Sequence, residues 1–343
     1  MLKTIQLGRR TGLKVSRLCL GTMNFGEPGR GHQGDWTLGI DDARPLFRAA
    51  IDKGLFYFDC ADIYGVGASE TVVGALLREL LPRDEYVLTT KISMPMGRNP
   101  NQGGLSRKHI IEGVESSLRR LGVDYVDQLI IHRHPHGVAG YEGTPLEETM
   151  EALHDVVKAG KALYLGASSM FAWQFAELQM LAESNGWTPF VSMQNHYNLV
   201  YREEEREMIP YCIKSGVAVT PWSPLARGIL AGAYQGGFSG GSTARSQGRD
   251  RIRTEGLYHG EAVFDIAGRV IETADKYGKR PAQIALAWLL GKPGVTAPVV
   301  GVSRLEQLDQ LVDAADITLD PADVAYLEAL YRPVQNLLSI GQS

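Results

Sequence analysis

Two side chains able to move a proton follow the apolar run Phe56-Tyr57-Phe58. Asp59 stands where this run ends, and Tyr64 lies in the loop that follows, which ends at Gly65. In a parallel α/β protein, the carboxyl ends of the strands are where chemistry is done. A carboxylate and a phenol held together there could transfer protons. An Asp that caps a turn and a Tyr that lines a loop would give the same pattern.

Two further polar residues end apolar runs later in the chain. Lys91 ends the run 86–91, and His132 ends the run 126–132. An unpaired buried ammonium loses its hydration, so Lys91 requires a partner. Asp59, one strand away, is the obvious one. An ammonium beside a phenol favours the phenolate, and we therefore expect Lys91 to lower the pKa of Tyr64.

These four residues suit the reduction of a carbonyl group. A phenol whose pKa is lowered toward neutral pH can donate a proton to a developing alkoxide. A neighbouring imidazole, here His132, can orient and polarise the carbonyl oxygen. The hydride would come from a cofactor. The alternative is a buried Asp59–Lys91 ion pair with Tyr64 and His132 as bystanders.

The elements that would position these residues alternate regularly between apolar strands and amphipathic helices. The expected strands are 18–23, 56–59, 86–91, 126–132, 162–167, 190–194, 217–222 and 297–301. Because they are apolar along their whole length, both faces should be buried, as in a parallel sheet covered by helices. Eight successive strand–helix units without a break in composition predict an α/β fold, a (β/α)₈ TIM barrel.

The alternative fold is a doubly wound open sheet. Such a sheet usually carries a G-x-G-x-x-G turn after its first strand. The turn here is Gly21-Thr22-Met23-Asn24-Phe25-Gly26, which lacks the second and third glycines at the right spacing. The barrel is therefore favoured, as a single domain over residues 1–343.

Helical periodicity and boundary residues predict the helices between these strands. They are expected at 43–53, 69–77 with Ser69 as N-cap, 106–121, 145–159, 172–185, 203–215, 263–277, 281–290 and 305–314, with an extra C-terminal helix at 321–330. An N-terminal hairpin is expected over 1–16, a Gly/Ser/Arg-rich excursion over 226–260 on the cofactor side, and an irregular tail over 333–343. The excursion and the loops 26–38, 94–104 and 132–144 all follow strands, which places them on the active face.

Composition narrows the class of protein. The 343 residues are 44% hydrophobic and 22% charged, an ordinary globular balance. A net charge of −4 gives no sign of a nucleic-acid or membrane partner, and no apolar run approaches the roughly 20 residues that span a bilayer. Cys19, Cys60 and Cys212 are too scattered for a disulfide framework or metal cluster and indicate a reducing compartment. With no apolar signal segment at its start, we expect a cytoplasmic protein, monomeric or homo-oligomeric, that acts on a small molecule.

The alternating histidines His132, His134 and His136 raise the question of a metal. Metal-dependent barrel hydrolases use H-x-H at a strand end, but they also need a further His and an Asp on later strands. No suitable Asp ends the seventh or eighth strand. We therefore expect no metal site, and a loop with Arg133 and Pro135 that shapes the substrate mouth.

From Leu7-Gly8 to about Leu330, the chain resembles the aldo-keto reductase superfamily. Its Leu-Gly-Arg opening and Trp-Ser-Pro-Leu-Ala run are similar to the bacterial branch related to potassium-channel β subunits. The motifs that carry the resemblance are Leu20-Gly21-Thr22-Met23, Asp59-Cys60-Ala61-Asp62-Ile63-Tyr64-Gly65, Thr90-Lys91, Ile131-His132, Gly166-Ala167-Ser168-Ser169, Gln194-Asn195-His196-Tyr197-Asn198, Trp222-Ser223-Pro224-Leu225 and Val300-Gly301-Val302-Ser303.

The resemblance implies a reversible, NADPH-dependent reduction of an aldehyde or ketone, with hydride passing from the nicotinamide C4 to the carbonyl carbon. Its catalytic set would be Asp59, Tyr64, Lys91 and His132, with Tyr64 as general acid/base. It also implies a nicotinamide site. Ser168, Ser169 and Gln194 would hold the carboxamide, and Trp222 takes the place of the ring that stacks on the nicotinamide.

The resemblance further implies donors for the cofactor's phosphates. Ser223, Leu225 and Gly228 fall where the family binds the diphosphate. Because a guanidinium pairs bidentately with phosphate, Arg304 favours NADP(H) over NAD(H). Arg245 lies near the position where relatives carry a second cation that binds phosphate. An arginine exposed to solvent in a loop would explain this residue equally well. The other expected cofactor contacts are Gly21, Thr22, Met23, Asp59, Pro224, Arg227, Gly301, Ser303, Gln307 and Gln310.

The expected substrate mouth is apolar and aromatic with one cation, a mix compatible with sugars, aryl aldehydes or polycyclic ketones. It comprises Met23, Phe25, Tyr64, Met94, His132, Arg133, Met170 and Trp222. A second hypothesis is a redox-linked regulatory subunit. It would bind the nucleotide and a partner protein and turn over slowly.

Overall fold

The computed structural model describes residues 2–31, 36–234, 236–248 and 250–334, the side chains of residues 244 and 245 excepted. Its centre is a sheet of eight parallel strands in the order β10-β3-β4-β5-β6-β7-β8-β9. Their bounds are β3 (Cys19–Gly21), β4 (Tyr57–Asp59), β5 (Val87–Ile92), β6 (Val126–Ile131), β7 (Ala162–Ser168), β8 (Phe190–Gln194), β9 (Ala218–Val219) and β10 (Val299–Val300).

The sheet curls until its two edge strands meet. Val219 of β9 forms a parallel bridge with Val295, just before β10. The Thr296 N–H donates to the Val219 carbonyl at 2.7 Å, and the Val299 N–H donates to the Pro221 carbonyl at 2.8 Å. These contacts close the ring, so the predicted (β/α)₈ barrel is confirmed.

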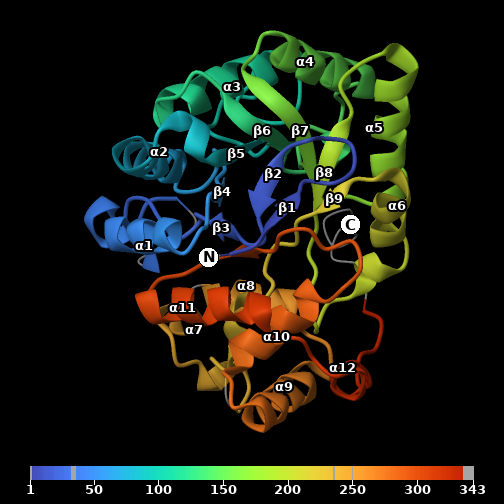
Figure 1. Ribbon diagram of the computed structural model, residues 1–343. Coiled ribbons are helices and arrows are strands. Elements are labelled where there is room, and N and C mark those ends of the chain that lie inside the picture. The colour runs from blue at the N-terminus through green and yellow to red at the C-terminus, as the bar shows by residue number, and fades with distance from the viewer. Residues whose placement is uncertain (1, 32–35, 235, 249, 335–343) are drawn as a thin grey trace.

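Helices surround the strands as an outer layer (Figure 1). All residues of β5, β6 and β8 are buried, as expected for strands with a barrel interior on one face and helices on the other. The helices are α1 (Ile40–Asp52), α2 (Ala68–Leu80), α3 (Arg107–Leu121), α4 (Leu146–Lys158), α5 (Ala172–Asn185), α6 (Met208–Ser215), α7 (Ala244–Gln247), α8 (Asp250–Leu257), α9 (Val263–Tyr277), α10 (Pro281–Leu290), α11 (Leu305–Asp313) and α12 (Pro321–Glu328). Short 3₁₀ turns occupy Arg83–Glu85, Pro135–Gly137, Glu203–Glu205, Ala226–Ala231, Phe238–Gly240 and Ala314–Asp316. No helix in this part of the chain is both long enough and apolar enough to cross a membrane.

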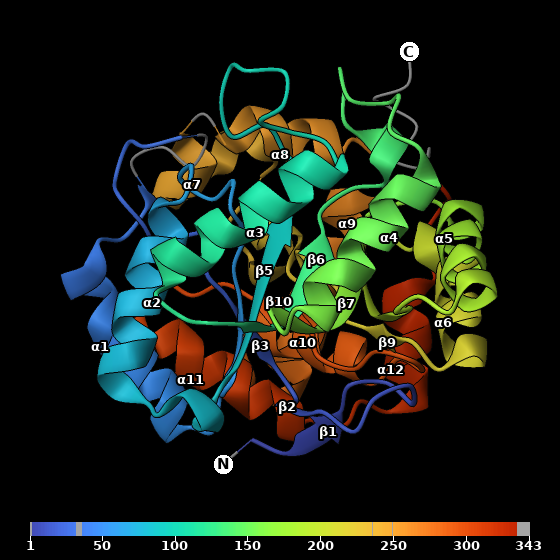
Figure 2. The same cartoon turned by 90° about the horizontal axis from the view of Figure 1, so that it is seen from above.

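The N-terminal hairpin closes one end of the barrel. Strands β1 (Thr4–Gln6) and β2 (Lys14–Ser16) pair antiparallel. Leu7 and Val15 pack in a fully buried cluster with residues at the beginnings of the barrel strands. Figure 2 shows this hairpin at the opposite end of the barrel from α7 and α8. Water is therefore excluded from the amino-terminal end, and the carboxyl end is left for a site.

Two helix predictions require correction. The expected helix 203–215 is split into a 3₁₀ turn and α6, because the ring of Pro210 conflicts with the carbonyl four residues earlier. Ser69 is not the N-cap of α2. That position belongs to Gly67 at φ +88°, and the buried Ser69 hydroxyl donates to the Thr22 carbonyl at 2.9 Å.

The excursion 226–260 contains α7 and α8, although only irregular chain was expected there. Helix α8 has large apolar side chains only at Ile252 and Leu257, and Ile252 is exposed. Such a helix shows no apolar stripe and cannot be recognised from periodicity.

Gly8 offers a test of how tightly the hairpin seals the barrel. It has φ +74°, and a Cβ there would lie 2.7 Å from the Gly216 carbonyl oxygen and 2.8 Å from the Ala218 nitrogen. We expect Gly8→Ala to lower the free energy of unfolding by about 2 kcal/mol or more, because left-handed backbone and a backbone clash combine. Gly12→Ala is the matched control, since a Cβ at Gly12 meets no atom within 4 Å. Urea unfolding measures both, and equal stability of the two variants would contradict the proposed seal.

Candidate active site

A buried ion pair lies at the centre of the carboxyl end of the barrel. The Lys91 Nζ lies 2.6 Å from the Asp59 Oδ2, and the two side chains are 0% and 2% exposed. Strands β4 and β5 are neighbours, with Asp59 opposite Thr89. Side chains two residues apart share one face of a strand, so Thr89 and Lys91 both reach Asp59. The pairing expected from the sequence is present.

Both oxygens of the Asp59 carboxylate are hydrogen bonded. Oδ2 accepts from Lys91, while Oδ1 accepts from the Thr89 hydroxyl at 2.9 Å and from the Gln194 amide nitrogen at 3.0 Å. Gln194 was expected to hold a cofactor carboxamide, and here its Nε2 is engaged by Asp59. Thr89 was not expected at all. Its position two residues before Lys91 is the signal that could have identified it.

Lys91 also reaches toward the phenol. Its Nζ donates to the Cys60 carbonyl at 2.9 Å and to the Tyr64 hydroxyl at 3.4 Å, and lies 5.1 Å from the centre of the Tyr64 ring. Burial alone would lower the pKa of Lys91, but the attraction of Asp59 and Tyr64 outweighs it and raises that pKa above its ordinary value. Lys91 is therefore a cation at neutral pH.

The expected lowering of the Tyr64 pKa is not observed as a net effect. Burial raises the pKa of the Tyr64 phenol, and Lys91 opposes this increase without cancelling it. The sequence indicated the neighbouring cation but not the depth of burial. Tyr64 is thus a protonated phenol at neutral pH, next to a cation that stabilises its conjugate base.

His132 faces this phenol. The two rings meet edge to face with centroids 6.0 Å apart. Burial, followed by the charges of Arg133, Lys91 and Arg253, lowers the pKa of His132 well below its ordinary value. Its Nδ1 is buried with no hydrogen-bond partner in the described part of the chain. A neutral imidazole keeps one N–H donor for a ligand oxygen.

A second group of residues, Trp222, Ser168 and Ser169, is linked by hydrogen bonds to Gln194 and is called the wall below. The Trp222 indole N–H donates to the Ser169 hydroxyl at 2.9 Å, and the Ser168 hydroxyl donates to the Gln194 carbonyl at 2.8 Å. Trp222 is partly exposed, and one of its faces is covered by His196. The exposed part of the ring could meet a planar ligand.

Strained backbone is concentrated near this wall. Among the described residues, five non-glycine residues adopt left-handed φ values of 48° to 56°. They are Val66 in the loop after Tyr64, and Ser169, Ser223, Ala226 and Arg227 near the wall. Each such conformation costs about 1–3 kcal/mol and persists mainly at ligand-binding segments. The Arg227 guanidinium is bound by Asp250 and by the Thr254 hydroxyl, so its charge is already paired.

The start of helix α11 is the other place suited to a phosphate. Arg304 is its N-cap and is exposed. Within the described residues, no hydrogen bond or ion pair involves the Arg304 side chain. The Gln307 side chain accepts from the Ser303 N–H at 2.9 Å and from its hydroxyl at 3.1 Å. The Gln310 side-chain nitrogen donates instead to the Glu306 carboxylate at 3.1 Å. A helix N-terminus with an unpaired guanidinium favours an anion.

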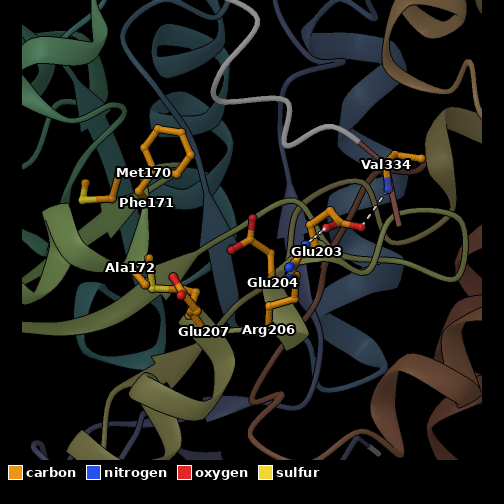
Figure 3. Close-up of a pocket in the computed structure, with 9 residues that line it drawn as sticks. Met170, Phe171, Ala172, Glu203, Glu204, Arg206, Glu207 and Val334 are labelled. Atoms are coloured by element: carbon orange, nitrogen blue, oxygen red, sulfur yellow. Dashed lines mark hydrogen bonds and ion pairs between the residues drawn. The ribbon is translucent and has the colours of Figure 1, made fainter. Parts of the chain in front are cut away.

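Two residues expected at the substrate mouth lie elsewhere. Phe25 is 1% exposed and packs edge to face on Phe47, 5.2 Å away, within the main core. Met170 is also 1% exposed. It lines a separate cavity of about 370 Å³ together with Phe171 and Glu204 (Figure 3). A position after a strand end does not determine which way a side chain points, and both residues leave the candidate substrate set.

The other residues expected at the substrate mouth are partly exposed, and their role there stays a prediction. Met23, Met94 and Arg133 are half-buried, and Arg133 donates to the His132 carbonyl at 2.8 Å. Burial and the neighbouring Arg253 lower the pKa of Arg133 to about 10. Arg253, on α8, is a charged neighbour that the sequence did not reveal.

Other expected cofactor positions vary in exposure. Gly21 ends β3 opposite Asp59, and the Thr22 hydroxyl donates to the Asp59 carbonyl at 2.9 Å. Pro224 is buried, Leu225 and Gly228 are half-buried, and Gly301 is exposed. Arg245 lies on α7, but its side chain is outside the described residues. In the described ranges, no three His, Cys, Asp or Glu side chains are arranged to hold a metal ion.

Comparisons with known proteins show what the chain is similar to. Residues 17–332 match the model of the aldo/keto reductase family. The versiconal hemiacetal acetate reductase of Aspergillus parasiticus is 42% identical over 94% of this chain and 95% of its own length. A Schizosaccharomyces pombe protein provisionally named as an aryl-alcohol dehydrogenase is 42% identical over 94% of both chains. The aldo-keto reductase AMT2 of Alternaria alternata is 42% identical over 94% of this chain and 90% of its own.

The ion pair generates a prediction for Lys91→Met. Removing one partner of a buried pair leaves an uncompensated charge, so we expect a loss of about 3–5 kcal/mol in the free energy of unfolding. The pKa of the Tyr64 phenol should also rise further, because the cation that lowers it is gone. Urea unfolding measures the change in stability. Ultraviolet titration measures the pKa of the Tyr64 phenol, as the difference between the Lys91→Met protein and the same protein with Tyr64→Phe added.

Lys53→Met is the control for this variant. It breaks an exposed pair with Asp309, at 2.6 Å, and should cost less than about 1 kcal/mol. A similar loss of stability in both variants would mean that the buried pair has no special role.

Proposed function

Because the chain belongs to the aldo/keto reductase family, we propose that it is an NADPH-dependent reductase that converts an aldehyde or ketone reversibly into the alcohol. The observation that carries this proposal is the run of hydrogen bonds from Asp59 through Lys91 to the Tyr64 hydroxyl, which ends beside a neutral His132. Its relatives carry the names of enzymes, which favours catalysis over a regulatory subunit.

Tyr64 is the proposed general acid. Its raised pKa keeps the phenol protonated at neutral pH, so the proton is available when negative charge develops on a carbonyl oxygen. Lys91 then stabilises the phenolate that remains, from 3.4 Å. Asp59 holds Lys91 in place, and the His132 N–H orients the carbonyl oxygen. A nicotinamide cofactor, when bound, supplies the hydride.

The residues beside the ion pair fit such a cofactor. The partly exposed ring of Trp222 would offer a flat aromatic surface to a nicotinamide ring. Ser169 and Ser168 would meet its carboxamide, and the left-handed segment 223–228 would meet the diphosphate. Arg304 at the start of α11 would pair with the adenosine 2′-phosphate.

An aromatic aldehyde or ketone is the proposed substrate. Met23 and Met94, which are expected at the mouth, are half-buried. Two relatives are named as a versiconal hemiacetal acetate reductase and, provisionally, an aryl-alcohol dehydrogenase. Flexible thioethers adapt to flat apolar ligands. Because Cys19, Cys60 and Cys212 are free and buried, we also propose a reducing, cytoplasmic location.

The first test is Tyr64→Phe, which keeps the ring and removes the acid. We expect the variant to fold and bind NADPH, while carbonyl reduction falls roughly 10²–10⁴-fold, the usual scale for a general acid. Tyr57→Phe is the control, because it removes another buried hydroxyl that contacts Gln128 at 3.3 Å and should retain activity. Steady-state reduction of a substituted benzaldehyde measures both. Near-wild-type turnover of Tyr64→Phe would refute the mechanism.

The second test concerns the choice of cofactor and uses Arg304→Ala. A 2′-phosphate carries about two negative charges, and charge-assisted hydrogen bonds contribute on the order of 1.5–3 kcal/mol. The dissociation constant for NADPH should therefore rise roughly 10- to 150-fold, while that for NADH stays nearly unchanged. Quenching of protein fluorescence measures both constants.

Arg119→Ala, an exposed arginine on α3, is the control and should alter neither constant. Equal affinity of the unmodified protein for NADPH and NADH would overturn the NADP(H) assignment.

A further inference from the structure

The Trp222 ring of the wall belongs to a stack of three rings. His196 lies between Tyr201 and Trp222, with ring centroids 4.3 Å and 4.1 Å away and interplanar angles of 15° and 9°. Both His196 and Tyr201 are buried, whereas Trp222 is partly exposed. The stack therefore supports Trp222 from the face that points away from the site.

Hydrogen bonds determine the orientation of the His196 ring. The Asn198 side-chain oxygen accepts from the Val200 N–H at 3.0 Å, so its Nδ2 must face the other way. That nitrogen donates to the Ser223 carbonyl at 2.9 Å and to the Tyr258 hydroxyl at 3.2 Å, and lies 3.3 Å from the His196 Nε2. The Tyr258 hydroxyl is hydrogen bonded to the same Nε2 at 2.7 Å.

His196 is neutral and has no proton to exchange with a ligand. Its Nδ1 is buried with no hydrogen-bond partner in the described residues. Burial, with smaller contributions from Arg227 and Arg133, lowers the pKa of His196 to about 3. The ring therefore acts through packing and orientation.

Tyr258 follows directly after helix α8. The same helix holds Arg227 through Asp250 and through Thr254, whose hydroxyl lies 3.1 Å from the Arg227 Nε. Helix α8 thus contacts Arg227, which lies in the segment that follows Trp222, and Tyr258 contacts the His196 ring behind Trp222. These contacts fix the wall before any ligand arrives.

We propose that His196, held by Tyr258 and Asn198, is a positioning residue that fixes the plane of Trp222 and thereby the face of the nicotinamide that meets the carbonyl. The Trp222 ring has a hydrogen bond only at one edge, from its indole nitrogen to Ser169 at 2.9 Å. One contact at an edge permits tilting, and a parallel ring 4.1 Å behind prevents it. The proposal rests on the proposed function, with Trp222 as the nicotinamide-facing ring.

Three variants separate the ring from its hydrogen bonds. His196→Leu removes the stacking ring, His196→Phe retains a ring without Nε2, and Tyr258→Phe removes only the hydroxyl that is hydrogen bonded to Nε2. Dissociation constants for NADPH and for 2′,5′-ADP, a probe of the adenosine half alone, are measured for each. Phe175→Leu is the control for loss of a buried ring, since Phe175 packs on Phe190 away from the wall.

We expect His196→Leu to weaken NADPH binding roughly 3- to 10-fold, the scale of one stacked pair, with the 2′,5′-ADP constant unchanged. Deuteride transfer from stereospecifically labelled NADPH should lose its strict preference for one face. Without any cofactor, the Trp222 contribution to near-ultraviolet circular dichroism, taken as the difference from Trp222→Phe, should decrease. His196→Phe should restore most of each property, and Tyr258→Phe should show a smaller NADPH defect.

Three outcomes overturn the proposal in the folded protein. They are unchanged NADPH affinity and facial preference in His196→Leu, a His196→Phe variant as impaired as His196→Leu, or parallel loss of NADPH and 2′,5′-ADP affinity. If His196→Leu does not fold, Tyr258→Phe decides, and an unaltered NADPH constant there refutes the role of the hydrogen bond. If the unmodified protein binds NADPH and reduces no carbonyl compound, the proposed function fails. The positioning role of His196 is still tested in that case by the dissociation constants for NADPH and 2′,5′-ADP.

Discussion

The rest of the site depends on one buried ion pair, Lys91 with Asp59. Moving two charges out of water is expensive, and their attraction repays it only with good geometry and further hydrogen bonds. Both conditions hold, because Asp59 has three donors and the Lys91 ammonium also meets the Cys60 carbonyl and the Tyr64 hydroxyl. Since apolar residues could fill this space without loss of stability, the pair is best explained by what it does to Tyr64.

The barrel supplies the dry, polar interior that such a pair requires. The two-residue period of β5 points Thr89 and Lys91 to the same side, and Leu7 and Val15 seal the opposite end with apolar contacts. The strained segments near Trp222 lie at the open end, where ligands would bind. The Asp59–Lys91 pair and the strained segments near Trp222 thus lie at one end, and the apolar packing of the hairpin closes the other.

Much of this arrangement could be predicted from the sequence, because apolar strands and Gly-bounded helices follow from local patterns. Helices α9 and α10 begin and end where periodicity placed them. The convergence of Asp59 and Lys91 follows from their positions at neighbouring strand ends. Local patterns do not report the direction of a side chain after a strand, so Phe25 and Met170 were misplaced. Helix α8 was missed because too few apolar residues mark it.

Burial was the other quantity that the sequence could not supply, and it changes the chemistry of Tyr64. The nearby cation suggested a more acidic phenol, whereas desolvation outweighs the cation and keeps the proton on. For reduction this is the useful state, because the acid must carry a proton at neutral pH. For oxidation of an alcohol the phenolate is needed, and Lys91 is the group that stabilises it. The opposition between burial and charge therefore lets one phenol serve both directions of the proposed reaction.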